Sequence, residues 1–157
     1  MLVGGEELQV VTFSLAAESY GIEIGEVQEI IPVLPIIRVP EAPTWIEGLV
    51  DLRGTILPVV DLRKRFGLAP LDGSPTQCII VVNLPEQSLG LIVDAVRDVT
   101  RLPWDAISAV PPAAGARARF LSGIARVPEG TGHRLLLLLE LDKLLSGDEV
   151  RELAGLS

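Results

Sequence analysis

The sequence predicts a mainly β fold made of two similar small β-barrels. Apolar residues make up 48% of the 157 residues, and most of them are Val, Ile and Leu in short runs. One of 15 glycines or 12 prolines interrupts these runs every few positions, which suits strands and turns better than a helical bundle. A weak internal duplication of the apolar pattern indicates that one barrel-sized unit occurs twice.

The duplication relates two pairs of segments, in which Val27 matches Val96 and Gly48 matches Gly123. Residues 19–40 (SYGIEIGEVQEIIPVLPIIRVP) correspond to 88–111, and residues 46–66 (IEGLVDLRGTILPVVDLRKRF) correspond to 121–145. The offset between matched residues grows along the chain, which indicates that loops were added while the apolar pattern stayed. We therefore expect a single domain over 1–157 with subdomains at 8–72 and 76–147, joined by a turn-rich link.

Each half contains five apolar runs of strand length. The runs are 8–15, 19–24, 33–39, 48–53 and 55–62 in the first half, and 77–84, 88–93, 99–103, 120–127 and 133–141 in the second. Five strands are enough to curl into a small closed barrel, which removes exposed sheet edges. Helix is expected only as short turns and as a C-terminal helix at 147–154, which Ser146 can cap.

Charge and ligand residues argue against several classes of function. The formal net charge of −8 disfavours nucleic-acid binding, and the basic run Arg63-Lys64-Arg65 fits a solvated helix or strand end. A single histidine, His133, and a single cysteine, Cys78, are too few for a His-rich or CxxC metal site. No phosphate loop or nucleophile elbow is recognisable, so we expect no catalysis, no cofactor and no metal.

Three features of the sequence indicate a cytoplasmic protein. A lone cysteine fits a reducing compartment, and the N-terminus lacks the basic and apolar regions of a signal peptide. The longest apolar run, 135–139, is far too short to cross a bilayer, so no membrane insertion is expected.

The segment 48–62 carries the most suggestive polar residues. Strand alternation puts Asp51 and Arg53 on one face, and Arg53 precedes Gly54 at a strand end, where its side chain reaches over the surface. Two interpretations stay open. Arg53 forms an exposed ion pair with Asp51 or Glu47, worth about 0–1 kcal/mol, or it contacts an acidic or amide-rich partner.

The run GLVDLRGTILPVVDLRKRFGL (48–68), with YGIEIGEVQEIIPV (20–33) and PEAPTWIEG (40–48) before it, resembles the signature of the chemotaxis coupling proteins, the CheW-like family. The resemblance extends in order from Leu8 to Leu153. It implies two five-stranded SH3-like β-barrels and no enzymatic activity. It also implies an adaptor that links the cytoplasmic tips of methyl-accepting chemotaxis receptors to the regulatory domain of the histidine kinase CheA, in arrays at the inner face of the membrane.

The resemblance implies roles for specific positions. Those linked with receptor binding are Val27, Glu29, Gly48, Arg53, Gly90, Val96 and Val99. Asp51 is a departure, since many relatives carry asparagine there, and it offers Arg53 a charge partner.

Receptor tips are helical hairpins, so a groove between the barrels would accept an amphipathic helix. The expected apolar floor is Val27, Ile30, Val96 and Val99, although Ile30 and Val99 also fit a barrel core. The kinase needs a separate surface, for which the candidates are Ile36, Ile37 and Phe120.

Three other hypotheses remain open. A CheW-like paralogue would couple receptor and kinase in a non-flagellar chemosensory pathway. A small enzyme on a duplicated barrel would need a pocket with converging acids or His133. A fragment of a larger protein, such as the kinase's regulatory domain or a coupler fused to a receiver domain, is less expected for a chain with an initial Met and a final helix.

Overall fold

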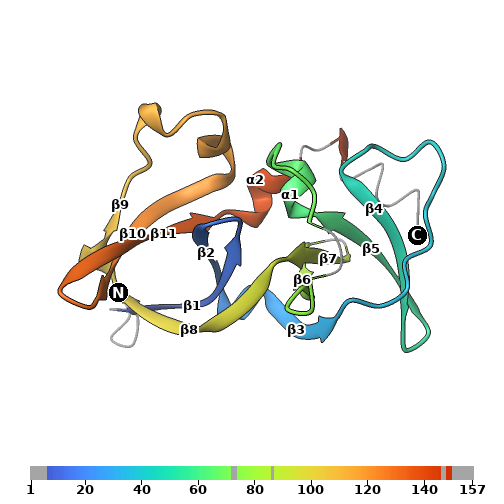
Figure 1. Cartoon of the computed structure of the whole chain (residues 1–157), viewed down its shortest axis with the longest axis horizontal. Helices are drawn as coiled ribbons and strands as arrows, with labels where there is room; N and C mark the ends of the chain where they lie inside the picture. Colours follow the sequence, from blue (N-terminus) through green and yellow to red (C-terminus); the bar gives the residue numbers. More distant parts are fainter. Residues whose placement is uncertain (1–6, 72–73, 86, 146–147, 150–157) are drawn as a thin grey trace.

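The computed structural model describes residues 7–71, 74–85, 87–145 and 148–149. They form two curled sheets that lie side by side (Figure 1). The five-stranded sheet, here the first barrel, contains β3 (Val27–Pro32), β4 (Ile46–Leu52), β5 (Thr55–Asp61), β6 (Cys78–Asn83) and β7 (Ser88–Val93). The six-stranded sheet, the second barrel, contains β1 (Glu7–Leu15), β2 (Glu18–Glu23), β8 (Ala95–Pro103), β9 (Ile107–Ser108), β10 (Leu121–Glu129) and β11 (Gly132–Leu139). The predicted mainly β fold is confirmed, with the two-residue strand β9 as an addition.

The helices are short, and all but α2, which follows β11, lie between strands in the chain. They are α1 (Leu62–Arg65), α2 (Leu141–Leu144) and the 3-10 turns η2 (Ile24–Glu26), η3 (Trp104–Ala106), η4 (Pro112–Ala114) and η5 (Ala116–Phe120). Asp61 caps α1, because its carboxylate accepts a hydrogen bond of 2.9 Å from the Arg63 N–H. The predicted helix at 147–154 falls almost wholly outside the described residues.

Among the described residues, no helix is both long and apolar enough to span a membrane.

The two halves of the chain exchange their first hairpins. Strands β1 and β2 pair with β8 and β11 of the second half, whereas β6 and β7 pair with β3 and β5 of the first. The order β3-β6-β7-β5-β4 is repeated, strand for strand, as β8-β1-β2-β11-β10. The topology thus agrees with the duplication, but the subdomain boundaries 8–72 and 76–147 are wrong, because each barrel takes a hairpin from the other half.

The third predicted strand is also misplaced. The strand lies at Val27–Pro32, and in the predicted range 33–39 only Ile37 makes an isolated bridge, to Leu49. Pro32 and Pro35 lack the N–H that a continued ladder needs, so regular pairing stops at the first of them.

A central core is shared by both barrels. It joins Phe13 and Tyr20 of the second barrel to Ile80 and Leu91 of the first. A row of aromatic rings crosses it, with centroid distances of 5.7 Å for Phe13–Tyr20, 5.6 Å for Tyr20–Phe66 and 5.1 Å for Phe66–Phe120. Each barrel also encloses a smaller apolar cluster of its own. The shared core packs the barrels against each other and so fixes the position of the residues at their junction.

Candidate functional site

The β4–β5 turn presents Arg53 at the surface. Leu52 pairs with Thr55, so Arg53 and Gly54 form a two-residue turn, and their φ angles are 52° and 88°. Positive φ at both positions is the type I′ geometry that matches the twist of a hairpin. The Gly54 N–H donates to the Asp51 carboxylate at 2.8 Å. A left-handed conformation costs a non-glycine residue about 1–2 kcal/mol, and here it holds an arginine whose side chain is 67% exposed.

Arg53 pairs with Glu29 across the seam of the first barrel. Its guanidinium donates to the Glu29 carboxylate at 2.5 Å; Glu29 lies on the edge strand β3, and Arg53 follows the opposite edge strand, β4. The expected pairing of Arg53 with Asp51 or Glu47 is wrong, because Asp51 binds the turn and Glu47 accepts from Lys64 at 2.8 Å. Since the Arg53–Glu29 pair is largely exposed, it contributes only about 0–1 kcal/mol to stability.

The four residues of the expected apolar floor lie on the edge strands β3 and β8, one in each barrel. Val27 and Val96 are half-buried and pack against the central core. Ile30 and Val99 are 44% and 53% exposed, so their interpretation as core residues is wrong. The floor therefore consists of two anchored valines and two exposed apolar side chains.

Gly48 and Gly90 are buried inside the first barrel. A Cβ on Gly48 would lie 2.3 Å from the Ile37 carbonyl oxygen, and its φ is +152°. A Cβ on Gly90 would lie 2.9 Å from the Ile79 side chain and 3.3 Å from that of Leu57. Both positions therefore act through the shape of the barrel, because neither has room for a side chain.

Replacing Gly48 with alanine should destabilise the protein more than replacing its repeat-equivalent, Gly123. A Cβ on Gly123 would meet Ile107 at 3.0 Å and the Ser108 carbonyl at 3.1 Å, without a positive φ. We expect Gly48→Ala to lower the free energy of unfolding by more than about 2 kcal/mol and Gly123→Ala by about 1 kcal/mol. Urea denaturation of both variants measures the difference; equal losses in the free energy of unfolding would show that the segment at 36–37 moves away freely.

The three kinase candidates lie in different environments. Ile36 is half-buried against the core of the first barrel, and Ile37 is 66% exposed. Phe120 is only 3% exposed and belongs to the central core, so its assignment as a surface contact is wrong. Phe120 ends the 3-10 turn η5, so its buried ring anchors the segment between β9 and β10 to the central core. Sequence reasoning did not single out Ile56 as an exposed apolar residue. Its side chain is 47% exposed and lies opposite Asp51, and strand alternation could have found it.

Asp94 is a second residue that sequence reasoning missed. It is the single residue between β7 and β8, where the chain crosses from the first barrel to the second. Its carboxylate accepts hydrogen bonds from Arg63 Nε at 2.8 Å and Nη2 at 2.6 Å, and from the Ala16 N–H at 2.7 Å. The side chains of Arg63 and Asp94 are only 13% and 12% exposed. This clamp ties α1 and the β1–β2 turn to the crossing point.

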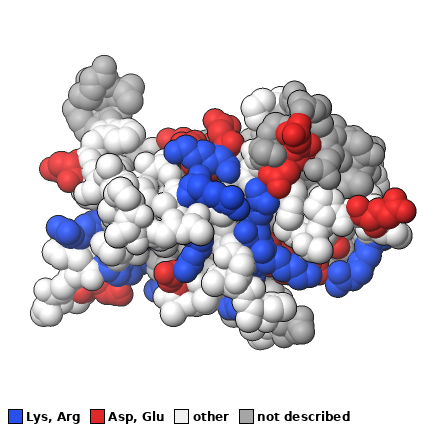
Figure 2. All heavy atoms as spheres, turned by 90° about the horizontal axis from the view of Figure 1, so that it is seen from above, with Lys and Arg blue, Asp and Glu red and all other residues white. Residues whose placement is uncertain are grey.

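The basic run at 63–65 is therefore not the solvated strand or helix end that was expected. Lys64 pairs with Glu47, and Arg65 binds Glu149 at 2.8 and 2.9 Å while lying 4.8 Å from the centroid of the Trp45 ring. Figure 2 views the molecule from above relative to Figure 1, the side on which α1 lies. It shows Lys and Arg side chains in a band across this face, with acidic side chains beside them.

Burial and local hydrogen bonds shift the pKa values of several ionisable groups. Burial raises the pKa of Tyr20 to about 12, although the hydrogen bond from Arg117 at 2.7 Å opposes the shift. Burial also raises the pKa of the Cys78 thiol. The Thr12 hydroxyl, 2.6 Å from the carboxylate, lowers the pKa of Asp98 on β8. Within the described ranges, no group of three or more His, Cys, Asp and Glu side chains is arranged to hold a metal ion.

Fold and site together define a double-barrel scaffold whose edge strands present apolar and ionic contacts. The family described as CheW-like domain matches residues 9–149. The chain is 34% identical to the chemotaxis protein CheW of Treponema pallidum, covering 99% of this chain and 92% of that protein. It is 35% identical to the CheW of Klebsiella aerogenes, covering 93% and 85%. The crystal structure of the scaffolding protein TtCheW from Thermoanaerobacter tengcongensis aligns with a TM-score of 0.81 and 37% identity, covering 90% of each chain. The chain belongs to the CheW-like family and is a chemotaxis coupling adaptor.

Proposed function

We propose that the chain, acting in the cytoplasm without catalysis, links the tips of methyl-accepting chemotaxis receptors to the regulatory domain of CheA in arrays at the inner face of the membrane. The observation that carries the receptor side is the Arg53–Glu29 pair, which is held on a strained turn yet contributes little to stability. The hairpin turn requires the positive φ but not an arginine at that position, so an arginine held there at a cost in backbone energy supports a role in recognition.

The receptor surface combines this ion pair with apolar side chains on β3 and β8. Arg53 uses one nitrogen for Glu29, and its exposed guanidinium has further donors for carboxylate or amide groups. Ile30 and Val99 offer apolar contact area on the two edge strands. An amphipathic receptor helix would match this surface with its apolar face on the strands and its polar rim on Arg53.

The kinase surface lies on the outer face of β4 and β5. Leu49 stands opposite Ile37, and Asp51 stands opposite Ile56, so these side chains share one face. Ile37 and Ile56 are 66% and 47% exposed, and Ile36 packs beneath them against Gly48. Neither Ile37 nor Ile56 takes part in the Arg53–Glu29 pair, so this apolar strip offers the kinase contacts that the receptor pair does not use.

A competition titration tests this arrangement. Labelled protein is titrated with a receptor cytoplasmic fragment, alone and with the CheA regulatory domain at saturation, and the receptor affinity should be unchanged within twofold. Ile56→Lys should weaken kinase binding at least tenfold, whereas Ile24→Lys, at an equally apolar side chain that is 41% exposed on η2, should not. Mutually exclusive binding of the two partners would contradict the proposal.

A further inference from the structure

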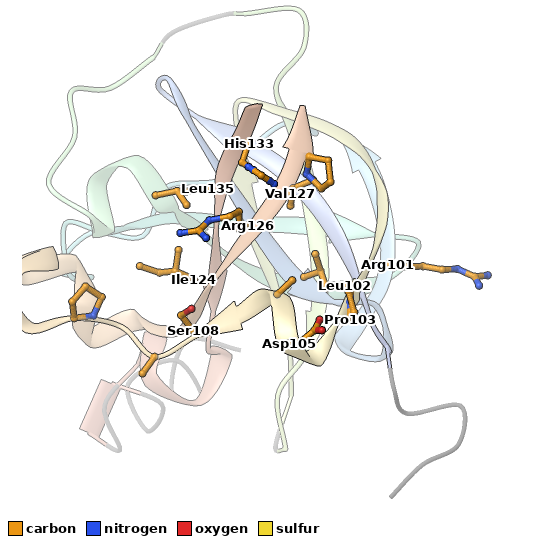
Figure 3. A pocket seen from close by; sticks show the side chains of 14 residues that line it. Arg101, Leu102, Pro103, Asp105, Ser108, Ile124, Arg126, Val127, His133 and Leu135 are labelled. Atoms are coloured by element: carbon orange, nitrogen blue, oxygen red, sulfur yellow. The ribbon is translucent and has the colours of Figure 1, made fainter. Parts of the chain in front are cut away.

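A cavity of about 680 Å³ opens on the side of the second barrel (Figure 3). It lies between the end of β8 and the strand β10. β9 pairs with β10 only at Ile124 and Ala125, so the rest of β10 is paired on one side, with β11. The cavity reaches through this opening to Leu102 and Val127, which belong to the apolar cluster inside the barrel. Its size is that of a site for a small molecule.

The lining combines apolar walls with a cationic group. Leu102 and Val127 form part of the inner wall, and Leu135, 56% exposed, lies on the outer side beside Arg126. Among the described residues, the Arg126 guanidinium takes part in no ion pair. Arg101 lines the entrance, but Figure 3 shows its side chain pointing away from the cavity.

The first barrel provides an internal comparison. Because Val50 pairs with Leu57 as Ala125 pairs with Leu136, Arg126 and Leu135 occupy the places of Asp51 and Ile56. The carboxylate of Asp51 is bound by the Gly54 N–H, whereas Arg126 is exposed and makes no ion pair within the part of the chain that the structure describes. The duplicated fold therefore does not require a cation here, and in a chain of net charge −8 this arginine places a positive charge beside an apolar cavity.

We propose that this cavity binds a small amphipathic carboxylate. Its apolar body would lie against Leu102, Val127 and Ile124, and its carboxylate would accept hydrogen bonds from Arg126, with the His133 ring at the same end. Asp105, which lines another part of the cavity, disfavours the reverse orientation, since two carboxylates would then approach each other. The site does not depend on the coupling function.

Titration with octanoate, octylammonium and octanol tests the charge and the apolar body separately. The chain is followed by ¹⁵N NMR and by calorimetry. Octanoate should give saturable shifts at the amides of 101–103 and 124–128, with at least fivefold higher affinity than either other probe. Arg126→Gln should remove this preference. Arg97→Gln changes an exposed arginine of β8 that does not line the cavity, and it should leave the preference intact.

Equal binding of octanoate and octylammonium would overturn the proposal. So would octanoate shifts that do not saturate, or that map to residues outside the cavity. Arg126→Gln and Arg97→Gln both alter exposed side chains, so a folded spectrum is expected for each. A further substitution, Leu135→Gln, removes part of the apolar wall and should lower the affinity for all three probes alike.

Discussion

Reversing the charge of Arg53 is expected to weaken binding of receptor cytoplasmic fragments by about 30-fold or more, a loss on the order of 2 kcal/mol. Arg53→Glu removes the guanidinium donors and places a carboxylate beside Glu29 and beside the receptor's acceptors. The free energy of unfolding should fall by no more than about 1 kcal/mol, because the exposed ion pair contributes little. Fluorescence anisotropy with a labelled receptor fragment, together with urea denaturation, measures both quantities.

Arg38→Glu is the matched control for this variant. The Arg38 side chain is 74% exposed, against 67% for Arg53, and it also donates to one carboxylate, that of Glu47 at 3.1 Å, but it lies on neither β3 nor β8. The control should keep receptor affinity within twofold of wild type. If Arg53→Glu instead lowers the free energy of unfolding by several kcal/mol, Arg53 is a structural residue and its assignment to the receptor surface fails.

The largest loss of stability is expected for Asp94→Ala. This change leaves the Arg63 guanidinium buried without its carboxylate and removes the acceptor of the Ala16 N–H. Breaking a buried ion pair from one side costs about 3–5 kcal/mol, because the remaining charge stays out of water. Urea denaturation should therefore show a large decrease in the transition midpoint, and full loss of the folded state is the limiting case.

A double variant separates the unpaired charge from the loss of packing. Replacing both partners with apolar residues, Asp94→Leu with Arg63→Met, should recover most of the lost stability, because neither side then carries an uncompensated charge. If Asp94→Ala costs less than about 1 kcal/mol, the clamp does not hold the crossing between the barrels.

The strands were largely predictable, but their partners were not. A short, almost continuous apolar run between turn segments marks a strand such as β5 or β7 locally, whichever sheet receives it. The exchange of the β1–β2 and β6–β7 hairpins depends on contacts between residues far apart in sequence, and the local pattern is the same with or without it. Edge strand β3 was missed because its outward face keeps Ile30 exposed, which weakens the alternation.

The site was predictable only where a motif marks it. The family resemblance singled out Arg53 and Glu29 as candidates, but their contact joins residues 24 positions apart, which local spacing does not show. Phe120 was predicted to lie at the surface because the local sequence around an aromatic residue at the start of a strand looks the same whether its ring is buried or exposed. Asp94 was missed because a lone acid between two strands resembles a solvated turn residue.

Co-sedimentation of receptor fragments, kinase and this chain tests the coupling account most directly. Wild type should bring CheA down with the receptor and raise its autophosphorylation, whereas Arg53→Glu should still bind CheA in solution but fail to recruit it. Kinase that sediments and is activated equally without the chain, or a wild-type chain that binds neither partner, would contradict the account.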